Sequence, residues 1–183
     1  IDDAATLATA DIVLTTANGT VDFASTINGG QGLTISAGSG AVALTGVVGG
    51  SAPLGSLAVT SSTGLTISNN ITTDNGLIDI NAPVTLGGDA VITSGTGGGN
   101  VDFSGAIDGG QALTLTSGTG NVVLGGAIGA NTGLSSLEIN AAALSIANNI
   151  TSNNGLIDIN APVTLTGDAV ITSGTGAGNV DFS

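Results

Sequence analysis

Carboxylates are the only ionisable side chains in this sequence. The 183 residues contain 13 Asp and Glu and no Lys, Arg, His, Cys or Tyr, and the formal net charge at pH 7 is −13. Seven Asp residues recur at matching places in a long internal repeat, and carboxylate oxygens are the ligands that Ca²⁺ prefers. The candidate calcium ligands are Asp22, Asp79, Asp89, Asp102, Asp158, Asp168 and Asp181.

The recurring aspartates have two interpretations. Asp22, Asp102 and Asp181 are equivalent in the repeat, and a ladder of equivalent carboxylates could hold Ca²⁺ or bind glycans. The segment Gly97–Asp102 comes close to the calcium-binding pattern G-G-x-G-x-D, but Asn100 stands where its fourth position requires Gly. The alternative is a solvated acidic surface that keeps an otherwise neutral chain soluble.

The same composition argues against catalysis and against two classes of partner. The chain offers no His or Lys base, no Cys nucleophile and no Arg clamp, and its carboxylates recur in every unit, whereas an active site is normally built once. We therefore expect no enzymatic activity and no cofactor other than the Ca²⁺ considered above. Without Lys or Arg, the chain cannot neutralise nucleic-acid phosphates or an anionic membrane surface. No apolar run approaches the length of a transmembrane segment.

A long internal repeat organises the chain. The segment from Asn69 to Ser104 returns between Asn148 and Ser183 at an offset of 79 in the numbering, and the segment that starts at Val21 returns from Val101 at an offset of 80. Self-similarity at a fixed period is typical of repeat architectures. We interpret 1–183 as one continuous solenoid segment, which divides into a partial repeat 1–20, repeats 21–100 and 101–179, and the start of a further repeat at 180–183.

Short apolar–polar–apolar triads between glycine-rich turns predict an all-β fold. In Ile78-Asp79-Ile80, the period of two places the outer residues inward and the middle residue outward. Leu115, Leu137 and Ile157 follow one another at intervals of 22 and 20 in the numbering. These intervals predict about four coils of roughly 20 residues in each repeat. Coils of this size fit a parallel β-helix, in which coils about 4.8 Å apart give an axial repeat of about 19 Å.

The aromatic, Asn and Thr residues have structural interpretations. Phe23, Phe103 and Phe182 lie one repeat apart, so we expect them to fill the core and not to form an aromatic ligand platform. The repeated Asn residues suit turns, where they tolerate left-handed backbone and bond neighbouring peptide groups. Outward Thr rows would favour an ice-binding face, but charged residues such as Asp102 and Glu138 interrupt them.

The repeat resembles those of giant bacterial surface proteins. The sequence from Val163 to Ser183, continued by the matching stretch 101–130, is similar to filamentous-haemagglutinin-like and β-strand-repeat exoproteins of cyanobacteria and other Gram-negative bacteria. The resemblance covers the whole chain and rests on composition and repeat texture. It implies a right-handed β-helix with a structural or adhesive role in an extracellular filament or cell-surface coat. The implied partners are more of the same solenoid, joined end to end, and host-cell or matrix glycans.

Overall fold

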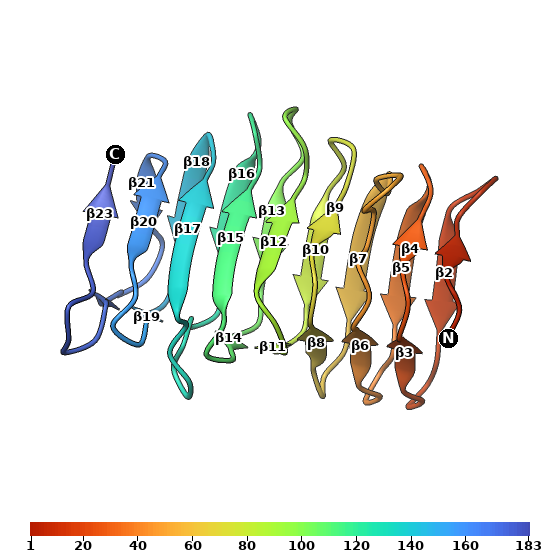
Figure 1. The fold of residues 1–183 in the computed structure, drawn as a ribbon, viewed down its shortest axis with the longest axis horizontal. Coiled ribbons are helices and arrows are strands. Elements are labelled where there is room, and N and C mark those ends of the chain that lie inside the picture. The colour runs from red at the N-terminus through yellow and green to blue at the C-terminus, as the bar shows by residue number, and fades with distance from the viewer.

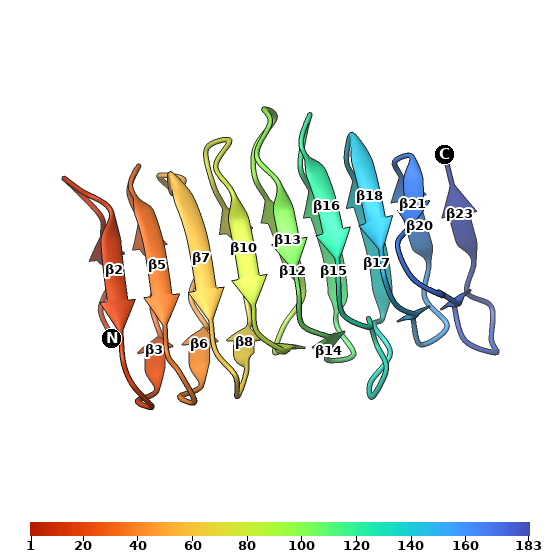
Figure 2. The same cartoon turned by 180° about the vertical axis from the view of Figure 1, so that it is seen from behind.

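The chain is a parallel β-solenoid. The computed structural model describes residues 1–183, contains no helix, and pairs every strand in parallel with a strand of a neighbouring coil. The coils lie side by side along the long axis, and the N- and C-termini lie at opposite ends (Figures 1 and 2). The predicted all-β parallel β-helix is confirmed.

Each coil has three sides, and the stacked sides form three faces. Face 1 consists of β1 (Ala5–Thr6), β4 (Ile27–Asn28), β9 (Ile71–Thr72), β12 (Ala90–Thr93), β15 (Ala112–Thr116), β17 (Ser136–Asn140), β20 (Ile157–Asn160) and β23 (Val180–Phe182). Face 2 consists of β2 (Ile12–Thr15), β5 (Gly32–Ser36), β7 (Ser56–Thr60), β10 (Ile78–Asn81), β13 (Val101–Phe103), β16 (Asn121–Leu124), β18 (Ala143–Ile146) and β21 (Val163–Leu165). Face 3 consists of β3 (Val21–Phe23), β6 (Val42–Leu44), β8 (Leu65–Ile67), β11 (Val84–Leu86), β14 (Ile107–Asp108), β19 (Ile150–Thr151) and β22 (Ile171–Thr172). Single bridges at Val48 and Ile128 complete faces 1 and 3.

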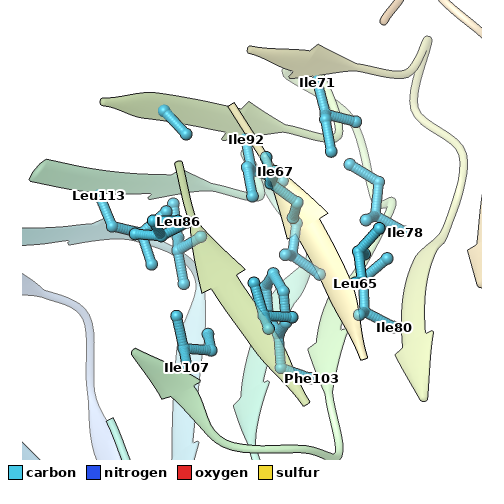
Figure 3. Packing of buried hydrophobic residues seen from close by; sticks show 14 of the residues in the cluster. Leu65, Ile67, Ile71, Ile78, Ile80, Leu86, Ile92, Phe103, Ile107 and Leu113 are labelled. Carbon is cyan, nitrogen blue, oxygen red and sulfur yellow. The ribbon is translucent and has the colours of Figure 1, made fainter. Parts of the chain in front are cut away.

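The alternation of each triad decides which side chains enter the core. In β10, Ile78 and Ile80 are fully buried, whereas Asp79 between them faces outward. The register places Ile78 between Leu57 of the previous coil and Val101 of the next, so that aliphatic side chains stack along the axis. A single cluster of 38 buried hydrophobic residues results, and Figure 3 shows its side chains converging from several strands. Burial of each Val, Leu or Ile contributes about 1.5–3 kcal/mol, so this core is the main source of stability.

The sequence repeat does not correspond to a whole number of coils. From β3 to its equivalent β13 the chain passes through eleven strand positions, with the Val48 bridge counted as one, and a further eleven lead to β23 through the Ile128 bridge. Eleven positions in three-sided coils make three and two-thirds coils, whereas the sequence had predicted four. The coils are also slightly longer than the roughly 20 residues predicted, as the chain makes only seven coils between Ile12 and Val163 on face 2.

Equivalent residues therefore lie on different faces. Phe23 lies in β3 on face 3, Phe103 in β13 on face 2 and Phe182 in β23 on face 1. Phe23 and Phe103 are buried, which confirms their prediction as core residues that do not stack on one another. Phe182 is exposed because it belongs to the last coil, which no further coil covers. At about 4.8 Å per coil, the axial repeat becomes about 18 Å.

Asn side chains join successive coils at the corners. The side-chain oxygens of Asn70, Asn100 and Asn149 accept backbone N–H groups from the next coil at 2.8–2.9 Å. Asn75 and Asn154 are the only residues other than Gly with positive φ, at 60° and 61°, and each accepts an N–H bond from a glycine of the following coil. The predicted structural role of Asn is confirmed, since these bonds satisfy polar groups where the strand ladders stop.

One amino-acid difference between the two repeats is matched by a second difference in the neighbouring coil. A Cβ at Gly87 would lie 2.5 Å from the Ser68 hydroxyl oxygen of the previous coil. In the second repeat Thr166 replaces this glycine, and the residue equivalent to Ser68 is Ala147, which has no hydroxyl. The Thr166 hydroxyl donates to the Ile146 carbonyl oxygen instead. The two substitutions fit one another, so neighbouring coils constrain each other's sequence.

Candidate cation-binding and adhesive surface

Equivalent aspartates of successive repeats do not stack into a ladder. Asp22, Asp102 and Asp181 lie on faces 3, 2 and 1, and Asp79 and Asp158 lie on faces 2 and 1. The reason is the repeat length, which moves each equivalent position round by one face. Equivalent carboxylates of successive repeats are therefore not brought side by side, and binding of Ca²⁺ by the individual candidates stays a prediction.

The fold brings together non-equivalent aspartates instead. On face 2, Asp79 and Asp102 are register partners on adjacent parallel strands, and on face 1 Asp158 and Asp181 form the corresponding pair. We call these the paired carboxylates. Glu138 precedes Asp158 on face 1. Sequence equivalence missed these pairs, because their members are one coil apart along the chain and not one repeat apart.

Asp102 is the most perturbed member of the paired carboxylates. Its side chain is partly buried, and its Oδ1 atom is buried without a hydrogen-bond partner. The Asp79 carboxylate on one side accepts a 2.9 Å bond from the Asn81 amide, and Val123 lies on the other side. Burial, and then repulsion by Asp79, raise the pKa of Asp102. A bound cation would favour the charged carboxylate and so would offset the effects of burial and repulsion on this pKa.

Asp89 and Asp108 have structural roles at corners. Asp89 Oδ1 accepts the Ala112 N–H of the next coil at 2.9 Å. Asp108 Oδ1 accepts the N–H groups of Asn131 and Thr132, and its Oδ2 accepts from the Asn131 side-chain amide. Partial burial acts to raise the pKa of Asp108, but the hydrogen bonds outweigh it and the pKa is lowered.

The sequence analysis did not single out Asp108, although a signal for its role existed. Asp108 occupies the position of Asn28 in the earlier repeat, and Asn28 Oδ1 makes the same pair of bonds to Ser51 and Ala52. An exchange of Asp for Asn at one repeat position indicates an oxygen acceptor. Asp168 is the equivalent of Asp89 and is exposed in the last coil, where no further coil lies over it.

The remaining sequence predictions concern small motifs on the surface. The segment Gly97–Asp102 turns a corner at which the Gly97 N–H donates to Asn75 Oδ1. No group of three or more His, Cys, Asp or Glu side chains is arranged to hold a metal ion. Outward Thr114 is flanked by Val91 and Glu138, so charge interrupts the Thr row as expected.

Comparisons with protein-family models, with curated proteins and with solved structures found no match. The surface has no pocket, and no helix long and apolar enough to cross a membrane occurs in the structure. The features that remain for function are the three regular faces and the paired carboxylates.

Replacing Asp102 with Asn should stabilise the protein at neutral pH by up to about 0.5 kcal/mol, the usual range for surface changes. Because the folded-state pKa of Asp102 is raised, the folded protein favours the protonated carboxyl group. The stability that Asp102 contributes is therefore complete at low pH and is lost as the pH rises through the folded-state pKa. The advantage of the variant should therefore be present at pH 7 and absent below the unfolded pKa of about 3.9. Thermal melting at both pH values measures it.

Asp108→Asn provides a control, because it should change the stability at pH 7 in the opposite direction. The lowered pKa of Asp108 means that its charge stabilises the fold above the unfolded pKa, and that this contribution is lost as the pH falls through the folded pKa. This variant should melt below the wild type at pH 7 and approach it in acid. The same pH dependence for both variants would contradict the assigned environments.

Proposed function

We propose that this chain is a segment of a long extracellular solenoid fibre or cell-surface coat with a structural and adhesive role. The observation that supports it is the continuous core, in which each coil is covered by the next across all three faces. A solenoid of this kind gains length by adding coils, since each coil contacts only its neighbours. The proposal assigns no catalytic role, because carboxylates are the only acids and bases that the side chains supply.

The proposed partners are more of the same solenoid and, for adhesion, host-cell or matrix glycans. Within the chain, Leu86 and Phe103 are only 3% and 1% exposed, because neighbouring coils cover them. Burial of such apolar side chains, at about 25 cal/mol per Å², favours the stacking of one coil on the next.

The extracellular, adhesive role can be tested with antibodies and glycans. Antibodies raised against the folded segment should label intact, unpermeabilised cells and the filaments that they shed, in immunogold electron microscopy. The purified segment should bind a subset of glycans on an array, and an unfolded sample of the same chain should not. Labelling that requires permeabilised cells, with no glycan bound, would contradict the proposal.

A second candidate function is a repeat scaffold that binds Ca²⁺ or glycans through the paired carboxylates. The unpartnered Asp102 Oδ1 beside Asp79 favours it, because Ca²⁺ accepts oxygen ligands from carboxylates and water with flexible geometry. Binding to the folded state alone would raise stability by about 2.7 kcal/mol at a hundred times the dissociation constant. Calcium-dependent melting therefore distinguishes a cation-binding scaffold from a purely structural fibre.

Two variants of equal charge make this test specific. The first removes the paired carboxylates by Asn substitution at Asp79, Asp102, Asp158 and Asp181. The second removes four unpaired ones at Asp2, Asp22, Asp74 and Asp168. Millimolar Ca²⁺ should raise the melting temperature of the wild type and the second variant, but not of the first. A shift that is equal in both variants would indicate screening of net charge and would exclude the site.

A further inference from the structure

The number of strand positions in a sequence repeat, compared with the number in a coil, determines on which face each part of the repeat lies. Each strand stacks on the strand three positions earlier, and the sequence repeats after eleven positions. Every equivalent pair of strands obeys the resulting shift: β3 and β13 move from face 3 to face 2, β5 and β15 from face 2 to face 1, and β9 and β19 from face 1 to face 3. Because three and eleven share no common factor, each face of a longer array runs through all eleven strand types before any of them returns.

We infer that arrays of this repeat form a solenoid with threefold screw symmetry, which presents one surface in three directions. Each repeat advances the chain by about 18 Å and turns the same surface onto the adjacent face, and three repeats, or eleven coils, restore it after about 53 Å. The paired carboxylates already show one step of this screw, on face 2 at Asp79 and Asp102 and on face 1 at Asp158 and Asp181.

The screw sets the valency of the fibre toward any partner. A partner that recognises the surface of one repeat finds it on all sides, one repeat apart along the axis. A flat surface that touches one face meets the same feature only every third repeat, about 53 Å apart. Insertion or loss of one whole repeat keeps every coil contact but turns all that follows by one face. The adhesive use of this valency depends on the proposed function, whereas the screw itself depends only on the strand register.

Pairs of spin labels can measure the screw in this chain. The chain contains no Cys, so introduced cysteines are labelled without background. Thr34 and Thr114 are equivalent residues one repeat apart, on faces 2 and 1. Val123 lies on face 2 four coils after Thr34, where a four-coil repeat would have placed the equivalent residue. All three side chains face outward.

Electron–electron distances should differ between the two double variants. Thr34→Cys with Val123→Cys should give about 19 Å, the height of four coils on one face. Thr34→Cys with Thr114→Cys should give a longer distance, since its labels project from different faces at nearly the same axial separation. Equal distances in the two variants would place Thr114 on the face of Thr34 and would overturn the screw.

A second set of labelled positions tests the same inference in case labelling at the first set disturbs the local structure. Thr85→Cys with Thr164→Cys compares equivalent residues on faces 3 and 2, and Thr85→Cys with Thr172→Cys compares residues four coils apart on face 3. The equivalent pair should again give the longer distance. Failure of this order in both sets overturns the inference, and neither set depends on whether the fibre binds glycans or Ca²⁺.

Discussion

Replacing Val101 with Asp should destabilise the solenoid by at least about 3 kcal/mol, because it places an unpaired carboxylate in an aliphatic interior. Val101 is fully buried in β13, and its neighbours in the core are Ile78 of the previous coil and Val122 of the next. No side chain that could pair with the new charge exists, since the sequence lacks Lys, Arg and His. The loss should appear as a lower midpoint in urea unfolding at pH 7.

Val91→Asp is the matched control for this substitution. Val91 lies in β12 between two fully or largely buried residues, but its own side chain points outward and is 42% exposed. Its register partner Thr114 is uncharged, so the new carboxylate meets no like charge in the next coil. This variant should lose about 0.5–1 kcal/mol, the scale of strand propensity and of surface changes. Equal losses in the two variants would mean that the inward and outward positions are reversed.

The triads carried enough information to predict the fold and the core. Ile78-Asp79-Ile80 has the burial pattern expected from its alternation, since both Ile side chains are buried and Asp79 faces outward. The two inward apolar residues of such a short strand must pack against similar residues on both neighbouring strands. Stacked parallel coils supply these neighbours on either side. The predicted parallel solenoid follows from this local chemistry together with the repeat.

The number of coils per repeat could not be obtained from the same pattern. Leu115 and Leu137 looked like partners on successive coils, but the register pairs Leu113 with Leu137 and Leu115 with Ile139. Corner loops vary in length, so that successive coils of face 2 differ in the number of residues that they contain. Because any triad can occupy any face of a three-sided coil, the sequence repeat has no need to close on the face where it began.

Which carboxylates lie side by side could not be predicted, for the same reason. Grouping Asp22 with Asp102 followed sequence equivalence, whereas a cation or partner contacts residues that are adjacent in register. Only the coil length places Asp79 beside Asp102, and coil length is the quantity that the sequence left uncertain. The corner role of Asp108 likewise depends on which backbone N–H groups the next coil brings within reach. The family resemblance, handedness and extracellular location stay predictions.

Replacing Gly76 with Ala should cost about 3 kcal/mol, the upper part of the range for overpacking, because the obstacle is backbone. A Cβ at Gly76 would overlap the Gly55 carbonyl oxygen and approach the Ser56 Cα in the coil beneath. A carbonyl in that position cannot rotate away as a side chain can, so the two coils must separate. The coil contact recurs in the second repeat, where a Cβ at Gly155 would overlap the Ser135 carbonyl oxygen.

The effect of Gly76→Ala should also be local, since each coil of a solenoid contacts only its neighbours. Hydrogen exchange should accelerate most at amides between the two coils, such as the Leu57 N–H that donates to Leu77, and least in β20. Gly98→Ala is the matched control, because its Cβ would meet only the Thr119 hydroxyl at 3.9 Å and Ala177 occupies the equivalent position. It should change the free energy of unfolding, measured in urea, by no more than about 0.5 kcal/mol. If Gly76→Ala were as mild as this control, the close approach of the coil backbones at Gly76 would be refuted.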